Sequence, residues 1–241
     1  MQGYKPATAT SDNEMRSTMV FSEVSIPASV DWRTSAVTGV KNQGSCGSCW
    51  AFSATGAMEG VNKIKTGSLI SLSEQQVVDC SKSYGNMACN GGLMDNAFKY
   101  AKANKMETEA DYGYTGRAGT CAYSAAKGKV QLSGLSDVTP NSGSQLQAAV
   151  AQQPVSVAIE ADKSVFQSYK SGIITSTTCG TSIDHGVLAV GYGTESGTDY
   201  WIVKNSWGST WGEKGYVRIG RSSGSGAGIC GIQSQPSYPK E

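Results

Sequence analysis

The sequence predicts an α+β protein in two parts, a helical first half and a sheet-forming second half. Apolar residues recur at helical spacing in three stretches between residues 49 and 101. After Pro154, runs of β-branched and aromatic residues replace them. A stretch rich in serine, glycine and proline over 133–144 separates the two patterns, so we expect domains at 26–135 and 136–241.

Three helices are expected in the first half: one over residues 49–65, a short one that follows Ser71 and ends near Cys80, and one over 94–101. Gly67 follows the first helix and is a candidate left-handed C-terminal cap. Because the periodic pattern begins at residue 49, Cys49 is expected in the first turn of that helix. Ser71 and Glu74 have the spacing of a capping box and predict the start of the second helix.

Four strands are expected in the second half, over residues 155–159, 185–192, 200–204 and 216–219. The stretch 193–198 lies between two of them and is predicted to be a hairpin loop. These strands predict an antiparallel sheet or a barrel.

Composition excludes several classes of protein. Lysine and arginine total 20 against 19 aspartate and glutamate residues, a net charge of +1, so we expect no nucleic-acid partner. No apolar run reaches the roughly 20 residues that span a bilayer, so we expect no membrane partner. His185 is the only histidine, which excludes multi-histidine zinc sites, and no metal or other cofactor is expected.

Residues 1–25 are polar and lack both the charged and the apolar region of a signal peptide. We interpret this stretch as the remnant of a propeptide or as an added tail.

One motif and two single residues carry the chemistry. Residues 43–52 read QGSCGSCWAF and match C-G-[SA]-C-[WY], the pattern around the reactive cysteine of papain and the cathepsins. His185 lies 136 residues after Cys49, and Asn205 lies 156 residues after Cys49. This is the order expected of a base and its orienting group. From Ile26 to its C-terminus the chain resembles the papain-like cysteine proteases of the papain and cathepsin L type.

That resemblance implies a fold and an activity. The fold would have a helical left domain and an antiparallel β-barrel right domain, with termini that cross between them and the active-site cleft between the two. The activity would be that of a cysteine endopeptidase, made as a zymogen, which hydrolyses extended polypeptides through a thioester acyl-enzyme and prefers apolar P2 side chains.

Nucleophilic catalysis by a cysteine requires residues of these types. A thiol with a pKa of about 8.5 is mostly protonated at neutral pH, so a nucleophilic cysteine needs a positive environment. The helix N-terminus supplies part of it, and a protonated His185 would supply the rest. We therefore expect Cys49 and His185 to meet as a charge pair, with Cys49 attacking the scissile carbonyl and His185 protonating the leaving amine.

The resemblance assigns supporting roles near this pair. Asn205 would accept a hydrogen bond from the second ring nitrogen of His185, and Trp207 would shield that bond, although Trp207 could equally be an ordinary core residue. Gln43 would donate to the oxyanion together with the Cys49 backbone. Asp184 is expected to be a modulating carboxylate rather than a third catalytic acid.

Substrate contacts follow from the same resemblance. Gly91 and Gly92 match a strip whose backbone pairs with an extended peptide, although a turn before a helix would also explain them. The S2 pocket would be formed by Leu93, Met94, Ala158, Ile183 and Gly186, with Gln235 at its floor. Met94 also fits the core stripe of its own helix. The neutral amide of Gln235 gives weaker reason to expect arginine at P2 than a glutamate would.

Seven cysteines leave one thiol over, and the other six allow 15 pairings by counting alone. The resemblance selects Cys46 with Cys89, Cys80 with Cys121, and Cys179 with Cys230, and leaves Cys49 free. Such disulfides suit a lysosomal, vacuolar or secreted protein.

Two other functions compete with hydrolysis. Cys46 and Cys49 form a C-x-x-C that elsewhere marks a redox centre or half of a zinc site, and a non-catalytic peptide-binding relative is a third class. An exopeptidase would need an occluding-loop histidine that this chain lacks.

The expected partners are polypeptide substrates, the chain's own propeptide and cystatin-type inhibitors, and the expected state is a monomer. Because the main inhibitory prodomain is missing, we expect trimming of residues 1–25 to barely alter peptide hydrolysis.

Overall fold

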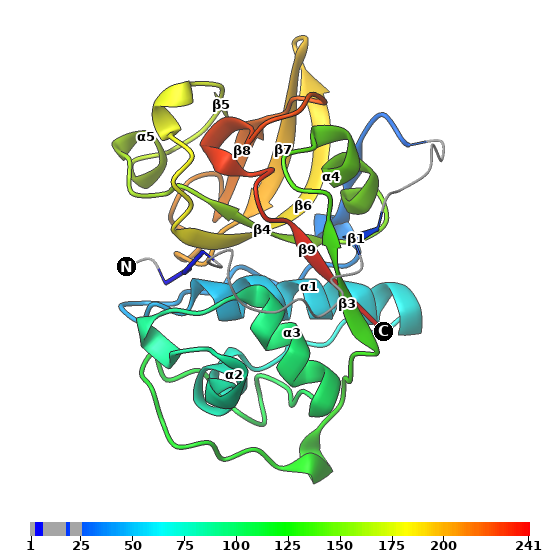
Figure 1. The fold of residues 1–241 in the computed structure, drawn as a ribbon, viewed down its shortest axis with the longest axis vertical. Coiled ribbons are helices and arrows are strands. Elements are labelled where there is room, and N and C mark those ends of the chain that lie inside the picture. The colour runs from blue at the N-terminus through cyan, green and yellow to red at the C-terminus, as the bar shows by residue number, and fades with distance from the viewer. Residues whose placement is uncertain (1–2, 7–17, 20–25) are drawn as a thin grey trace.

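The computed structural model describes residues 3–6, 18–19 and 26–241. One long helix, α1 (Cys49–Thr66), crosses the middle of the molecule, with most of the sheet on one side and the other two α-helices of the first half on the other (Figure 1). These are α2 (Glu74–Cys80) and α3 (Met94–Ala103). None of the helices in the described ranges has the length and apolarity needed to cross a membrane.

The helix ends follow local capping chemistry. Gly67 ends α1 with a φ of 78°, a left-handed conformation that glycine adopts without steric cost. The N-cap of α2 is Ser73, whose hydroxyl accepts the backbone N–H of Gln76 at 2.9 Å. The prediction of Ser71 as the start of a capping box was therefore wrong by two residues, because the backbone of Ser71 bonds to Glu109 instead.

The described strands form one sheet in the order β1-β3-β9-β4-β6-β7-β8-β5, with β2 paired to β6. Their bounds are β1 (Thr18–Met19), β2 (Val30–Asp31), β3 (Gly134–Val138), β4 (Val155–Ile159), β5 (Ile173–Ile174), β6 (His185–Glu195), β7 (Thr198–Lys204), β8 (Tyr216–Gly220) and β9 (Ser237–Lys240). The prediction of antiparallel pairing is confirmed for the four expected strands, since β4–β6, β6–β7 and β7–β8 are antiparallel. The prediction of a barrel was wrong, because the sheet is open, and the additional pairs β1–β3 and β5–β8 are parallel. The path ends on β1 and β5, which do not pair with each other in the described part of the chain, so the sheet is not closed.

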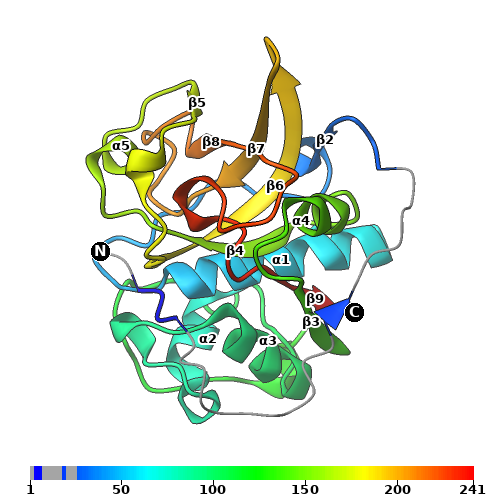
Figure 2. The ribbon, with the colours of Figure 1, turned by 45° about the horizontal axis from the view of Figure 1, so that its top comes forward.

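The hairpin between β6 and β7 is tighter than the predicted loop over 193–198. The strands run to Glu195 and resume at Thr198, so only Ser196 and Gly197 turn the chain (Figure 2). Their φ values of 49° and 80° are those of a primed turn, which matches the twist of the flanking strands.

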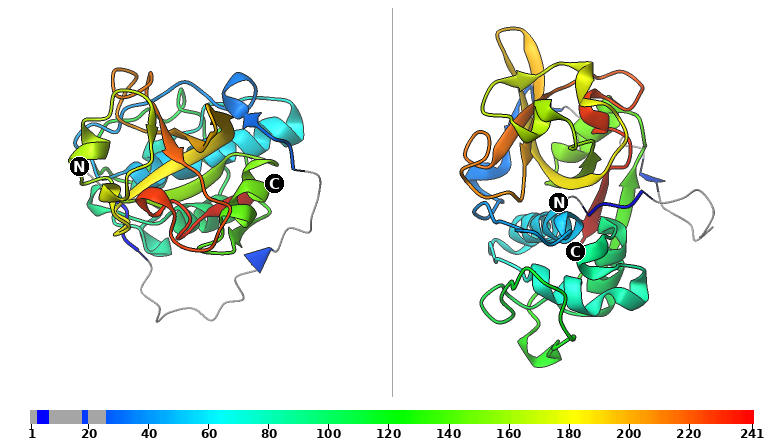
Figure 3. Two further views of the ribbon diagram at one scale, coloured as in Figure 1. Left: turned by 90° about the horizontal axis from the view of Figure 1, so that it is seen from above. Right: turned by 90° about the vertical axis from the view of Figure 1, so that its left-hand side faces the viewer.

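Strand β6 separates two cores. Leu188 and Val190 belong to the cluster that contains α1, α2 and α3, whereas Val187 and Ala189 belong to the cluster within the sheet half. Successive side chains of a strand point to opposite faces, so one strand serves both clusters. The two halves appear as separate layers with α1 between them (Figure 3).

Short segments tie the ends of the chain to this frame. Strand β2 pairs with β6, and the C-terminal strand β9 pairs with β3, which occupies the stretch expected as a domain boundary. The remaining helices, α4 (Gly143–Val150) and α5 (Ser164–Gln167), pack their apolar residues into the core of the sheet half.

Candidate active site

Cys49 is the first residue of α1, and its side chain is fully buried. Its sulfur accepts the backbone N–H groups of Gly186 at 3.4 Å and of Gly3 at 3.3 Å. Because Gly186 directly follows His185, the structure brings the start of α1 and the start of β6 together.

The other six cysteines form three disulfides with the predicted pairing, Cys46–Cys89, Cys80–Cys121 and Cys179–Cys230. Cys49 is the one free thiol of the chain, as predicted. The alternative interpretation of the C-x-x-C pair as a dithiol or a zinc half-site is wrong, because the Cys46 sulfur is bonded to that of Cys89.

His185 and Asn205 are brought together by the β6–β7 pair, in which Leu188 lies opposite Lys204. The Nε2 atom of His185 lies 2.8 Å from Oδ1 of Asn205. That oxygen also accepts the backbone N–H of Ser206 at 2.8 Å, so it is an acceptor and His185 Nε2 carries the proton. In the neutral ring Nδ1 is then the basic nitrogen, and no hydrogen bond reaches it from the described residues.

Aromatic rings cover this pair. The Trp207 ring centroid lies 4.9 Å from that of His185, with an interplanar angle of 35°. Phe166 packs edge-on against Trp207 at 5.4 Å. Trp207 therefore lies where a shield for the histidine would, and it also packs against the core of the sheet half.

Burial governs the protonation of both reactive groups. It raises the pKa of the Cys49 thiol, against the opposing backbone N–H groups of Gly186 and Gly3. It also lowers the pKa of His185 to about 4, although the hydrogen bond with Asn205 acts in the other direction. With residues 3–5 lying over the site, the neutral thiol and imidazole are favoured over the expected charge pair.

Gln43 is fully buried beside the nucleophile, and its amide is held at both ends. Nε2 donates to the carbonyl of Cys46 at 3.0 Å, and Oε1 accepts the Ser206 hydroxyl at 2.7 Å. These bonds orient the amide nitrogen toward the turn that leads to Cys49, as an oxyanion donor requires.

The glycine strip holds a peptide, and that peptide is the chain's own N-terminus. Gly92 N–H donates to Gly3 O at 2.8 Å, and Lys5 N–H donates to Gly92 O at 3.3 Å. Gly91 has a φ of 115°, and a Cβ built there would lie 2.6 Å from the Gly3 oxygen. A side chain at Gly91 would therefore block the peptide.

Tyr4 enters the predicted S2 pocket. Its side chain is 7% exposed, its hydroxyl donates to Gln235 Oε1, and its backbone N–H donates to the Asp184 carbonyl at 3.2 Å. It shares a buried cluster with Met94 and Ala158, against which Leu93 and Ile183 pack. Gly186 lies beside the same pocket, since a Cβ there would be 3.1 Å from the Met94 sulfur.

The same contacts place two residues whose roles had alternatives. Met94 packs in the core with the rest of its helix, as its second interpretation predicts, and its role in the S2 pocket stays a prediction. The Asp184 carboxylate accepts the Ala161 backbone N–H at 2.8 Å, and burial raises its pKa.

The N-terminal segment runs in the opposite order to a substrate. In a substrate the P2 residue precedes the residue whose carbonyl meets the nucleophile. Here Tyr4 in the pocket follows Gly3 at the sulfur, and Tyr4 pairs in parallel with Gly92. The structure does not support the expectation that residues 1–25 barely affect the cleft, because residues 3–5 fill the strip and the pocket.

Two residues near the site were missed by the sequence analysis. Ser206 holds the Gln43 amide and adjoins Asn205, so its place next to a candidate residue was a usable signal. The hydroxyl of Tyr114 donates to the Gln43 carbonyl at 2.8 Å across 71 residues, and no local pattern points to it.

Known proteins share this arrangement. A family model described as papain family cysteine protease matches residues 26–240. Probable cysteine protease RD21B of Arabidopsis thaliana is 55% identical over 217 residues, 89% of this chain and 46% of that protein. A low-temperature-induced cysteine proteinase of Solanum lycopersicum is 55% identical over 218 residues, 89% of this chain and 62% of that protein. The chain thus spans about half to two-thirds of the length of these relatives.

Solved structures are similar in fold. Digestive procathepsin L 3 from the larval midgut of Tenebrio molitor superposes with a TM-score of 0.88 at 46% identity, covering 95% of this chain and 75% of that one. The Carica candamarcensis cysteine protease CMS1MS2, solved in complex with E-64, gives a TM-score of 0.83 at 44% identity, covering 90% of this chain and 99% of that one.

Proposed function

This chain belongs to the papain family of cysteine proteases, and on that premise we propose that it is an endopeptidase that cleaves extended polypeptides through a thioester on Cys49. One observation carries the proposal. The single free thiol lies at the N-terminus of α1, and its sulfur is 3.4 Å from the backbone nitrogen next to a histidine that is itself held by Asn205.

The first half of the reaction begins with proton transfer. When the N-terminal segment leaves, water reaches the cleft and the ionic forms of both groups become less costly. His185 Nδ1 then takes the proton of Cys49, and the thiolate attacks the scissile carbonyl carbon. The carbon–nitrogen bond breaks as Nδ1 returns a proton to the leaving amine, which leaves a thioester on the sulfur.

The tetrahedral intermediate needs donors aimed at its oxygen. The Gln43 amide and the backbone N–H of Cys49 are the proposed pair, since the first N–H groups of a helix have no partner within it. Residues already held by hydrogen bonds need little reorganisation at the moment of reaction.

The second half regenerates the enzyme. His185 Nδ1 removes a proton from water as its oxygen attacks the thioester carbonyl, and the carbon–sulfur bond breaks. The acid product leaves, and Cys49 and His185 return to their starting state. Asn205 keeps Nε2 protonated, so that Nδ1 is the nitrogen that cycles.

We propose that the pocket around Met94, Ala158 and Gln235 selects the P2 side chain. The apolar wall favours aliphatic and aromatic residues, and the Gln235 amide gives a tyrosine hydroxyl a partner, as it does for Tyr4. Arginine at P2 is disfavoured because the pocket floor offers an amide in place of a carboxylate.

We further propose that residues 1–25 are the end of a propeptide, of which residues 3–5 lie in the cleft in the non-cleavable direction. Cystatin-type inhibitors are the proposed partners of the uncovered cleft. Three disulfides support a lysosomal, vacuolar or extracellular compartment.

Profiling against a fluorogenic peptide library tests the proposed function, with Cys49→Ala beside the parent chain. We expect internal cleavage with apolar or aromatic P2 residues by the parent and none by the variant. Equal activity in the two would refute the cysteine mechanism. Peptide binding without turnover by the parent would instead support a non-catalytic peptide-binding protein.

A further inference from the structure

The hydroxyl of Tyr114 joins two residues of the segment that leads to the nucleophile, Gln43 and Ser48. It donates to the backbone carbonyl of Gln43 at 2.8 Å, so the Ser48 hydroxyl, 2.7 Å away, donates to it. Gln43 carries one proposed oxyanion donor, and Ser48 precedes Cys49, whose backbone N–H is the other. One phenol oxygen thus spans both sides of the proposed oxyanion hole.

We propose that Tyr114 is a positioning residue for the reaction, which sets the spacing between the Gln43 amide and the first turn of α1. The proposal rests on the proposed function, because it assigns Tyr114 to the oxyanion hole of that reaction. The hydroxyl of Tyr114 bonds to Gln43 and Ser48, so the proposed role acts through these two residues.

Tyr114 can hold a position because its own surroundings are rigid. Its ring packs edge-to-face on Phe52 of α1, with centroids 4.9 Å apart. Its backbone N–H donates to Glu109 Oε1 at 3.1 Å. The residue is therefore fixed by both its ring and its backbone, with the hydroxyl at the far end.

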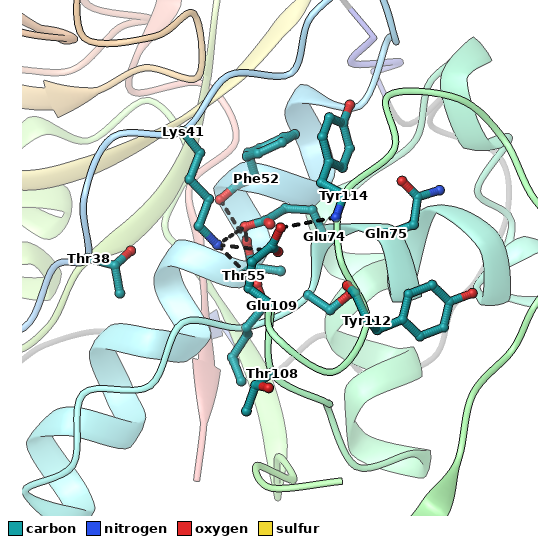
Figure 4. Close-up of polar contacts among 12 residues, drawn as sticks. Thr38, Lys41, Phe52, Thr55, Glu74, Gln75, Thr108, Glu109, Tyr112 and Tyr114 are labelled. Carbon is teal, nitrogen blue, oxygen red and sulfur yellow. Dashed lines mark hydrogen bonds and ion pairs between the residues drawn. The ribbon is translucent and has the colours of Figure 1, made fainter. Parts of the chain in front are cut away.

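A buried charge cluster anchors that backbone contact (Figure 4). Lys41 Nζ lies 2.7 Å from Glu74 Oε1, 3.3 Å from Glu59 Oε1 and 3.9 Å from Glu109 Oε2. Thr55 of α1 donates to the same Glu74 oxygen at 2.6 Å. The cluster thus ties the loop of Tyr114 to α1 and α2 through the buried carboxylates Glu59 and Glu74 and the partly exposed Lys41 and Glu109.

The pKa of the Glu74 carboxyl is raised within this cluster. Burial raises its pKa to about 8, Lys41 opposes the rise, and Glu59 and the hydrogen bond with Glu109 add to it.

Position matters because an oxyanion hole works only at hydrogen-bond distance from the developing charge. A shift of about 1 Å in a positioning contact can cost about 100-fold in rate. Loss of a whole oxyanion donor costs about 10² to 10³, so loss of a residue that only aims the donors must cost less. We expect Tyr114→Phe to lower kcat about 5- to 30-fold with KM within about twofold of the parent.

Tyr112→Phe is the matched control on the same loop. The Tyr112 hydroxyl also makes two hydrogen bonds, to Asp79 Oδ2 at 2.8 Å and from the Ala122 N–H at 3.1 Å, and neither partner adjoins the site. Both variants lose one phenol oxygen, so their melting temperatures should fall by similar amounts. Only Tyr114→Phe should lower kcat.

A double-mutant cycle with Gln43→Ala separates positioning from general damage. If Tyr114 acts by aiming Gln43, its loss costs much less in kcat once the Gln43 amide is gone. Peptide-aldehyde affinity is a second readout, because the aldehyde adduct places an oxyanion in the hole. It should fall in Tyr114→Phe together with kcat.

Ser48→Ala decides the question if Tyr114→Phe does not fold. The Ser48 side chain makes no capping hydrogen bond to α1, so its removal leaves the helix cap unchanged. We expect kcat to fall about threefold or more with KM retained, as one buried hydrogen bond is lost.

The proposal is overturned if Tyr114→Phe and Ser48→Ala keep the parent kcat, if Tyr114→Phe changes only KM, or if its effect is fully additive with that of Gln43→Ala. A chain freed of residues 1–25 that hydrolyses no peptide would instead refute the proposed function. All kinetics use the full chain, with active sites counted by an irreversible thiol reagent.

Discussion

Replacing Tyr4 by alanine should open the cleft of the full-length chain and raise its activity. Tyr4 is the only residue of the described 3–6 segment whose side chain fills a pocket, where it bonds to Gln235. The neighbouring backbone contacts to Gly92 and Asp184 would remain in the variant. Any gain in activity therefore reports on the side chain in the pocket.

The contacts set the size of the effect. Burying an aromatic side chain contributes about 1.5–3 kcal/mol, and its hydrogen bond contributes about 1 kcal/mol. A loss of about 3 kcal/mol weakens occupancy of the cleft on the order of 100-fold, since each 1.4 kcal/mol is tenfold. Activity should rise until it reaches that of a chain without residues 1–25.

Two measurements check this expectation. The first is kcat/KM on a fluorogenic peptide, and the second is the rate at which iodoacetamide alkylates Cys49, which needs no substrate pocket. Lys5→Ala is the control, because the Lys5 side chain is exposed and its backbone contact to Gly92 is kept. Tyr4→Phe should lie between the control and Tyr4→Ala, since it loses only the hydrogen bond.

The reasoning fails if Tyr4→Ala and removal of residues 1–25 both leave hydrolysis and alkylation at the rates of the full chain. Alkylation that is accelerated in Lys5→Ala by the same factor as in Tyr4→Ala would also contradict the reasoning. The Tyr4 side chain in the pocket would then contribute no more to cleft occupancy than the exposed Lys5 side chain.

Three further expectations concern the site and its support. Gln43→Ala should lower kcat about 10² to 10³-fold in steady-state assays with little change in KM, and a loss below fivefold would argue against an oxyanion role. Glu74 is neutral when folded, with a pKa of about 8 against an ordinary 4.5, so its contribution to stability is full below pH 4.5 and lost as pH rises through 8. Glu74→Gln should remove that slope from urea midpoints measured between pH 4.5 and 8, and parallel curves for the two proteins would contradict it. Gln235→Glu should raise kcat/KM for arginine at P2 about tenfold relative to tyrosine in the same library. An unchanged ratio would contradict the assignment of Gln235 to the floor of the S2 pocket.

Short-range patterns were good guides to the elements. Helix α1 begins at Cys49 as its periodicity predicts, and the runs at 155–159 and 200–204 lie within β4 and β7. The errors came where competing local chemistry decided the outcome. Ser73 took the capping role of Ser71, and two residues with positive φ shortened the hairpin loop.

The barrel prediction failed for a reason that lies outside any single strand. Closure depends on whether the two edge strands reach each other, and both edges of the sheet are two-residue strands. Alternation along each strand is the same in an open sheet and in a barrel, so sequence pattern does not separate them.

By itself, the sequence determined which groups are available for chemistry and in what order they come: one unpaired thiol at a predicted helix start, one histidine, and an asparagine beyond it. These are properties of composition and of spacing along one helix or strand. Only the tertiary structure decided that Ser206 and Tyr114 hold Gln43, that Glu74 is buried beside Glu109, and that Tyr4 lies in the pocket. Each of these contacts joins segments that are distant along the chain, and its strength depends on burial and hydrogen-bond direction, which exist only once the segments have packed.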